Sequence, residues 1–115
     1  MYLGIDLGTS NSAVAGNNGS ELRLFKTAEG TDVLPSVIYI HKGGQKFVGV
    51  RAYDKAILSP ENVAQGFKRL MGTSSPIRFA AAALEMSPEE CSAEIIRTLL
   101  AQAKTEMVTS RSRAL

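Results

Sequence analysis

The chain has 115 residues, with 44% hydrophobic and 21% charged side chains and a formal net charge of +2, which is the composition of a folded soluble domain and not of a disordered segment. No apolar run approaches the ~18 residues of a transmembrane helix and no secretory signal opens the chain, so we expect no membrane partner and a cytoplasmic protein. The small net charge argues against a nucleic-acid partner, and one histidine with one cysteine argues against an ordinary zinc site.

The first part of the chain, residues 1–49, carries the signals of β structure. Three short apolar runs are separated by turn-forming residues: 2–5, 12–15 and 22–25. The second separator contains Asn17-Asn18-Gly19, and Asn-Gly is the strongest short hairpin signal. We therefore predict an antiparallel meander of three strands. The β-branched and aromatic run 36–40 and the run 46–48 are separated by glycines and predict a further hairpin.

Helical signals begin at residue 50. Apolar side chains at helical spacing predict a short helix over 50–58, which Ser59-Pro60 ends. A further helical turn can start at Pro60. Residues 73–86 are ambiguous, because the run 80–84 suits either a helix or an irregular link.

The clearest helix signal is the capping box Ser87-Pro88-Glu89-Glu90. Ser87 can accept a hydrogen bond from the N–H three residues on, while Glu90 can reach back to the Ser87 N–H. The apolar stripe that follows predicts a helix from about 88 to 105. Cys91 lies on this stripe, so we expect it in the core. Residues 107–115 lack the pattern and are expected to form a disordered tail.

The segment richest in chemistry is Gly4-Ile5-Asp6-Leu7-Gly8-Thr9-Ser10-Asn11-Ser12. A strand ends at Asp6, and a glycine turn with hydroxyl side chains follows. Backbone N–H groups of such a turn can converge on a phosphate, Gly8 permits close approach, and Asp6 could hold a hydrated Mg²⁺. The segment is neither a Walker A loop nor a dinucleotide fingerprint. On spacing alone, an ordinary hairpin turn with an Asx-type cap remains an equal alternative.

This segment resembles the first phosphate loop of the actin-like ATPases, which include DnaK-type (seventy-kilodalton heat-shock) chaperones, sugar kinases and bacterial actin-like filament proteins. Later segments are similar to the chaperone pattern in the same order: Ala28-Glu29-Gly30, Leu34-Pro35-Ser36-Val37-Ile38, Phe47-Val48-Gly49, Pro60-Glu61-Asn62, Phe67-Lys68-Arg69-Leu70-Met71-Gly72 and the helix after Ser87. The sugar kinases share little beyond the first loop, and the filament proteins lack the Lys-Arg-Leu-Met-Gly segment. These two branches are therefore the weaker alternatives.

The resemblance implies an α/β fold, α+β in the order of its elements. It would be the first part of the actin-like, ribonuclease-H-like ATPase fold, with a mixed β-sheet meander followed by helices. Residues 1–106 would form the first part of lobe I of the nucleotide-binding domain, and residues 107–115 would lie outside the match.

The resemblance also implies roles for individual residues. Gly8, Thr9, Ser10 and Asn11 would bind the β- and γ-phosphates of ATP or ADP. Asp6 would orient waters on Mg²⁺, and Lys68 would reach the γ-phosphate and the attacking water, so that Lys68 and Asp6 are the expected catalytic residues. Without the resemblance, Lys68 would be read as a solvated lysine.

The expected function is that of the N-terminal fragment of a DnaK-type molecular chaperone ATPase domain, whose parent would also bind client peptides and co-chaperones. The family carries a longer insert at residues 73–86, and its second phosphate loop and adenosine pocket would follow residue 115. We therefore expect weak nucleotide binding and negligible turnover from this chain alone. The alternative is a non-enzymatic interaction protein built on the truncated lobe, self-associating through an open strand edge or through the apolar face of helix 88–105.

Overall fold

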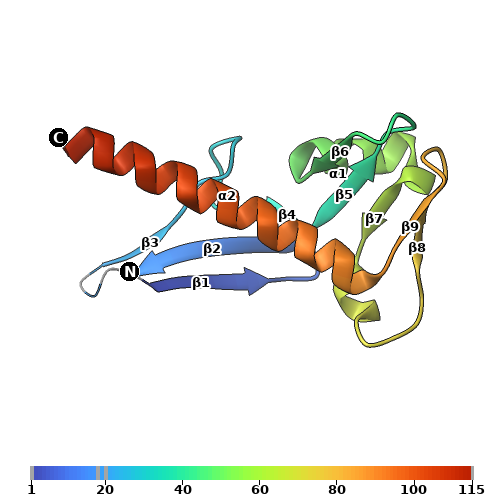
Figure 1. Cartoon of the computed structure of the whole chain (residues 1–115), viewed down its shortest axis with the longest axis horizontal. Coiled ribbons are helices and arrows are strands. Elements are labelled where there is room, and N and C mark those ends of the chain that lie inside the picture. The colour runs from blue at the N-terminus through green and yellow to red at the C-terminus, as the bar shows by residue number, and fades with distance from the viewer. Residues whose placement is uncertain (1, 18, 20, 115) are drawn as a thin grey trace.

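A computed structural model of the chain describes residues 2–17, 19 and 21–114, the residues 108–114 as backbone. The elements in chain order are β1 (Tyr2–Leu7), β2 (Asn11–Asn17), β3 (Leu22–Leu24), β4 (Leu34–Pro35), β5 (Val37–Ile40), β6 (Lys46–Val48), α1 (Val50–Leu58), the 3-10 turn η1 (Pro60–Asn62), β7 (Val63–Gln65), the 3-10 turn η2 (Phe67–Leu70), β8 (Ile77–Phe79), β9 (Leu84–Met86) and α2 (Pro88–Ala114). The strands form three groups, and Figure 1 shows α2 starting beside β7 and β9 and running along the group that contains β1 and β2. This is the mixed α+β architecture that was expected.

The first group is the predicted meander. β1 pairs antiparallel with β2, β2 with β3, and the short β4 with the start of β2. The predicted Asn17-Asn18-Gly19 turn falls partly outside the described residues. Ser12 and Val14 on β2 are buried toward α2, because alternate residues of a strand face the same side.

The second group is a three-stranded sheet in the order β6-β5-β7. All four residues of the central strand β5 are buried. Ile38 and Ile40 belong to the large core beneath α2, whereas Val37 and Tyr39 pack with Ala52 of α1. Because β5 is covered on both faces, it reads as a continuous apolar run rather than an alternating one. The predicted β5–β6 hairpin and the helix over 50–58 are confirmed.

The ambiguous segment 73–86 is a β-hairpin, neither a helix nor an irregular link. β8 pairs antiparallel with β9, and residues 80–83 make the turn between them. Ala83 adopts a positive φ of 50°, a conformation that alanine seldom takes. The turn is held from outside, because the Asn62 side-chain oxygen accepts a hydrogen bond of 2.7 Å from the Ala81 N–H. The strand β7 was also not predicted.

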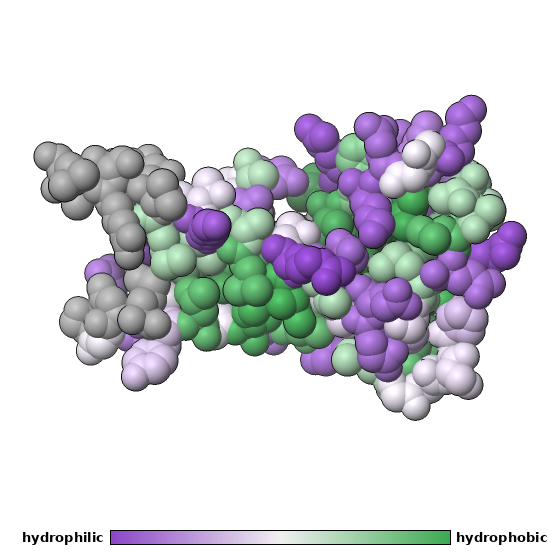
Figure 2. All heavy atoms as spheres, in the orientation of Figure 1, coloured by the Kyte–Doolittle hydropathy of each residue, from purple (hydrophilic) through white to green (hydrophobic). Residues whose placement is uncertain are grey.

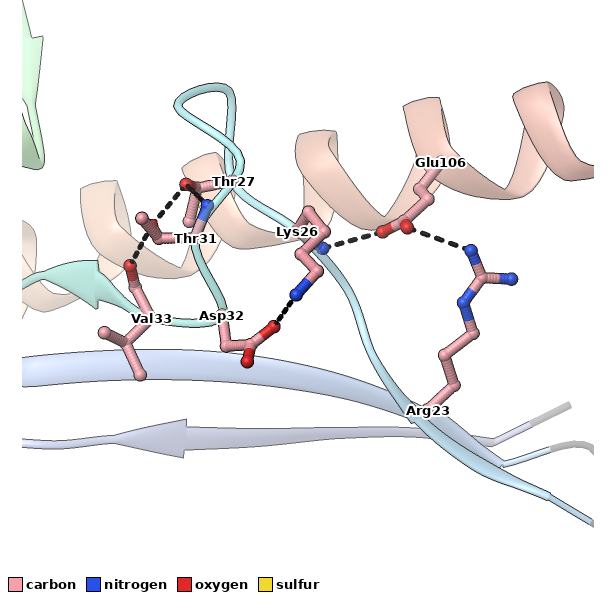
Figure 3. A network of polar contacts seen from close by, with 7 residues as sticks. All are labelled: Arg23, Lys26, Thr27, Thr31, Asp32, Val33 and Glu106. Atoms are coloured by element: carbon pink, nitrogen blue, oxygen red, sulfur yellow. Dashed lines mark hydrogen bonds and ion pairs between the residues drawn. The ribbon is translucent and has the colours of Figure 1, made fainter.

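The capping box of α2 is confirmed. The Glu90 N–H donates to Ser87 Oγ at 3.1 Å, and the Ser87 N–H donates to Glu90 Oε1 at 3.0 Å. The predicted end near residue 105 is wrong, because the helix continues to Ala114. Tertiary contacts support the added length: Glu106 accepts hydrogen bonds from the Lys26 backbone N–H at 2.7 Å and from Arg23 at 3.0 Å (Figure 3).

The apolar stripe of α2 closes the core over strands of all three groups. Cys91, Ile95 and Leu99 are at most 1% exposed. Burial, reinforced by the nearby carboxylates of Glu90 and Glu94, raises the pKa of the Cys91 thiol to about 12. The core position expected for Cys91 is therefore confirmed. In the part of the chain that the structure describes, no helix has the length and apolar character to cross a membrane.

Candidate functional site

The turn that joins β1 to β2 is shaped by Gly8. An ideal Cβ placed on Gly8 would lie 2.1 Å from the backbone oxygen of Asn11. Any other residue would force these two backbone segments apart, so the tight turn requires glycine. The Gly8 N–H points inward and donates to Ser12 Oγ at 3.2 Å.

Two buried serines support the inner side of this turn. Ser12 and Ser36 are each 1% exposed, and their Oγ atoms lie 2.8 Å apart. Ser36 Oγ donates to the Gly8 carbonyl at 2.9 Å, and the Ser36 N–H donates to the Ser10 carbonyl at 2.9 Å. The turn is thus anchored to the chain just after β4.

The outer side of the turn has its polar groups free. Within the described residues, neither the backbone N–H nor the hydroxyl of Thr9 or Ser10 makes a hydrogen bond. Both residues line an open pocket of about 240 Å³. The other lining residues are Ser36, Val37, Tyr53, Gln65, Gly66 and Arg69. Thr9 and Ser10 therefore bring two N–H groups and two hydroxyls without protein partners to the wall of this pocket.

The opposite wall is the start of η2. Gly66 has a φ of 66°, in the left-handed region that glycine accepts without strain. Phe67 then enters the core at 2% exposure, while the two basic residues that follow stay at the surface. Arg69 lines the pocket, whereas Lys68 does not. Lys68 is exposed and forms no ion pair with any residue that the structure describes.

Asp6 and Asn11 do not line this pocket. Asp6 is exposed and pairs with Ala13, so it faces the side of the sheet away from Ser12 and α2. Asn11 is exposed and begins β2. The structure thus brings Thr9 and Ser10 together with a residue that the sequence reasoning did not single out, Arg69.

The charge of the pocket favours an anion. Arg69 is the charged residue among those that line it, and a guanidinium can give two parallel hydrogen bonds to a phosphate. Arg69 directly follows Lys68, a predicted site residue, and this adjacency was the one feature of the sequence that could have indicated Arg69. Ser36 was present only as part of a family pattern, and Tyr53 and Gln65 gave no signal.

A phosphate group fits this arrangement, because residues with free N–H groups and hydroxyls line the same pocket as a guanidinium. For Mg²⁺, the described residues offer few direct ligands. The described residues hold no group of three or more metal-ligating side chains. A single exposed carboxylate, Asp6, suits an ion that keeps most of its waters and takes further oxygens from phosphates.

Comparison with known proteins identifies the class to which this fold and turn belong. The sequence model of the Hsp70 protein family matches residues 2–112. The chain is 39% identical to the chaperone protein DnaK of Endomicrobium trichonymphae over 101 residues, and this aligned stretch covers 84% of the chain. The chain therefore belongs to the Hsp70 family. It spans 16% of the length of that relative.

Proposed function

We propose that the chain is part of the ATPase domain of a DnaK-type chaperone and that its β1–β2 turn binds the β- and γ-phosphates of ATP or ADP. Residues 1–106 would be the first part of lobe I. The observation that carries this proposal is one pocket lined both by Thr9 and Ser10, whose N–H groups and hydroxyls are free, and by Arg69. Family membership supports nucleotide as the source of the phosphates.

Each residue has a distinct part in this proposal. Gly8 shapes the turn, while Thr9, Ser10 and Asn11 donate toward the phosphate oxygens. Phosphoryl transfer depends mainly on positioning and charge neutralisation, and Mg²⁺ supplies part of that neutralisation when it is bound. Asp6 would hold the waters of the ion.

Lys68 is proposed as the catalytic cation. Its side chain is long and has no ion pair among the described residues, so it is free to turn toward a γ-phosphate. Arg69 would hold the phosphates from the same 3-10 turn. Client peptides, co-chaperones and a cytoplasmic location belong to the proposal for the full-length protein.

A titration followed by nuclear magnetic resonance tests the phosphate site. Mg·ATP added to the ¹⁵N-labelled chain should shift the amide signals of Thr9, Ser10 and residues 66–69, with weak affinity. Arg69→Ala should weaken binding about tenfold or more, since it removes charge-assisted hydrogen bonds. Arg51→Ala is the matched control, because Arg51 is exposed on α1 outside this pocket. Shifts that avoid Thr9 and Ser10, or equal losses in both variants, would contradict the proposal.

A second candidate, a non-enzymatic interaction protein, is favoured by the free edge of β1. Among the described strands β1 pairs with β2 alone. Its apolar residues Tyr2, Leu3 and Ile5 are 81%, 41% and 38% exposed, and Figure 2 shows apolar side chains gathered over β1 and β2 beside α2. Unprotected edges pair with other chains. On the apolar stripe of α2, Ile95 and Leu99 are buried while Leu100 is 42% exposed, so that face offers less apolar surface to a second copy than β1 does.

A further inference from the structure

Two serines, Ser12 and Ser36, are buried behind the β1–β2 turn, where a hydroxyl has an energetic cost. A buried hydroxyl is unfavourable unless it is hydrogen-bonded, and alanine would fill nearly the same volume. Ser12 and Ser36 are nevertheless both 1% exposed; Ser12 lies in β2, and Ser36 lies between β4 and β5. Among the described residues, no buried side-chain nitrogen or oxygen lacks a partner. Packing alone does not require these two hydroxyls, so we look for their role in the hydrogen bonds that they make.

The direction of each hydrogen bond can be assigned by counting protons. A serine hydroxyl has one proton to donate. The Gly8 carbonyl can only accept, so the proton of Ser36 is used there. The proton between Ser12 and Ser36 must then belong to Ser12, which in turn accepts from the Gly8 N–H.

We propose that Ser12 and Ser36 are positioning residues that hold the phosphate-binding turn open. The Gly8 N–H donates to Ser12, Ser12 donates to Ser36, and Ser36 donates back to the Gly8 carbonyl, which closes a one-way ring. The ring fixes both polar groups of Gly8 inward, so that the next two N–H groups, of Thr9 and Ser10, face the pocket. The meaning of this ring for ligand binding rests on the proposed function.

The ring makes a prediction that simple packing does not. Hydrogen bonds in a chain polarise and orient one another, so breaking one link weakens the others. Removing the Ser36 hydroxyl deprives the Ser12 hydroxyl of its acceptor. The hydrogen bond from the Gly8 N–H to Ser12 should then weaken, although Ser36 makes no contact with that N–H. The effects of the two serines on the turn should then be non-additive.

Amide hydrogen exchange at Gly8 measures this directly. Ser12→Ala should speed exchange roughly tenfold, as expected for the loss of one hydrogen bond. Ser36→Ala should speed it several-fold, and the double variant should exchange no faster than Ser12→Ala. Ser92→Ala is the control, since Ser92 is a buried serine of α2 whose hydroxyl meets Met71 Sδ away from the turn. It should leave Gly8 exchange unchanged.

Unchanged Gly8 exchange in Ser36→Ala, or additive effects in the double variant, would overturn the ring. A measurement on the unaltered chain covers the case in which a variant fails to fold. The Ser12 and Ser36 hydroxyl protons should give separate, slowly exchanging resonances, and rapid averaging with water would equally refute the proposal.

Titration with inorganic phosphate separates this proposal from the proposed function. If the unaltered chain binds phosphate at Thr9 and Ser10, Ser36→Ala should weaken binding several-fold and Ser92→Ala should not. If the unaltered chain does not bind there while Gly8 exchange responds as expected, the ring stands and the phosphate site fails. If Ser36→Ala and Ser92→Ala bind phosphate as tightly as the unaltered chain does, the positioning role fails and the phosphate site stands.

Discussion

The residues of the β1–β2 turn divide their polar groups between the inside and the outside of the molecule. Gly8 gives both of its backbone groups to buried serines, whereas the N–H groups and hydroxyls of Thr9 and Ser10 make no hydrogen bond within the described residues. The absence of one Cβ makes this division possible, since the Asn11 carbonyl occupies the space that a side chain at Gly8 would need.

Gly8→Ala should therefore damage the turn and the fold together. The new Cβ meets backbone rather than a flexible side chain, so we expect the variant to lose about 1–3 kcal/mol of unfolding free energy, as in overpacked cores. Urea unfolding measures the loss. Gly4→Ala is the matched control, because a Cβ on Gly4 meets no atom within 4 Å. Equal midpoints for the two variants would show that the close approach at Asn11 is unimportant.

At this scale the sequence predicted the turn better than the pocket. Gly8, Thr9 and Ser10 were adjacent in one readable segment, so their shared location was foreseeable. Arg69 reaches the same pocket only because Gly66 reverses the chain and Phe67 anchors η2 in the core. Such a meeting of distant segments depends on tertiary packing, which spacing along the chain does not encode.

The junction between η2 and α2 shows how two elements are fastened by one side chain. The Gly72 N–H, just after η2, donates to Glu89 Oε1 at 2.8 Å in the first turn of α2. That hydrogen bond holds the pKa of Glu89 below its ordinary value of 4.5. Burial raises the pKa of Glu94, but Arg97 and Lys46 outweigh it, so the pKa of Glu94 is lowered as well.

These carboxylates should make the fold acid-sensitive. A group whose pKa is lower in the folded state contributes its full stabilisation above the unfolded value of 4.5 and loses it as the pH falls through the folded value. The urea midpoint should thus fall as the pH drops below about 5. Glu89→Gln should lower the midpoint at neutral pH and flatten this decline.

The matched control for that measurement is Glu29→Gln, since Glu29 is exposed and makes no hydrogen bond or ion pair within the described part of the chain. Its acid profile should follow that of the unaltered chain. A Glu89→Gln profile parallel to the unaltered one throughout the acid range would show that the Gly72 contact does not couple stability to pH.

Elements with strong local signals were predicted, and elements held by neighbours were not. The capping box at Ser87 and the meander were readable because a few adjacent residues define them. The three-residue strands β7, β8 and β9 are too short to show a period, and the alanines before Leu84 favour a helix rather than a turn. The helix end was missed because Glu106 supports it through β3 and its following loop.

On the scale of the whole molecule, the uncovered edge of β1 dominates the expected behaviour in solution. Ile5→Lys should reduce any self-association, because a lysine on an edge strand opposes pairing with another chain. Sedimentation velocity over a range of concentrations measures it. Ile57→Lys on α1, a position 83% exposed, is the control and should leave the distribution unchanged. A purely monomeric unaltered chain, or equal effects of both lysines, would contradict an interface at β1.

Cys91 gives the molecule a reporter of its own opening. It is the sole cysteine of the sequence, it sits where α2 closes over the core, and burial keeps its thiol protonated at neutral pH. Thiol reagents attack the thiolate, so modification must wait until the helix lifts from the strands beneath it. The rate at which such a reagent modifies Cys91 therefore reports how often α2 opens, and the measurement needs no label or substitution in the chain.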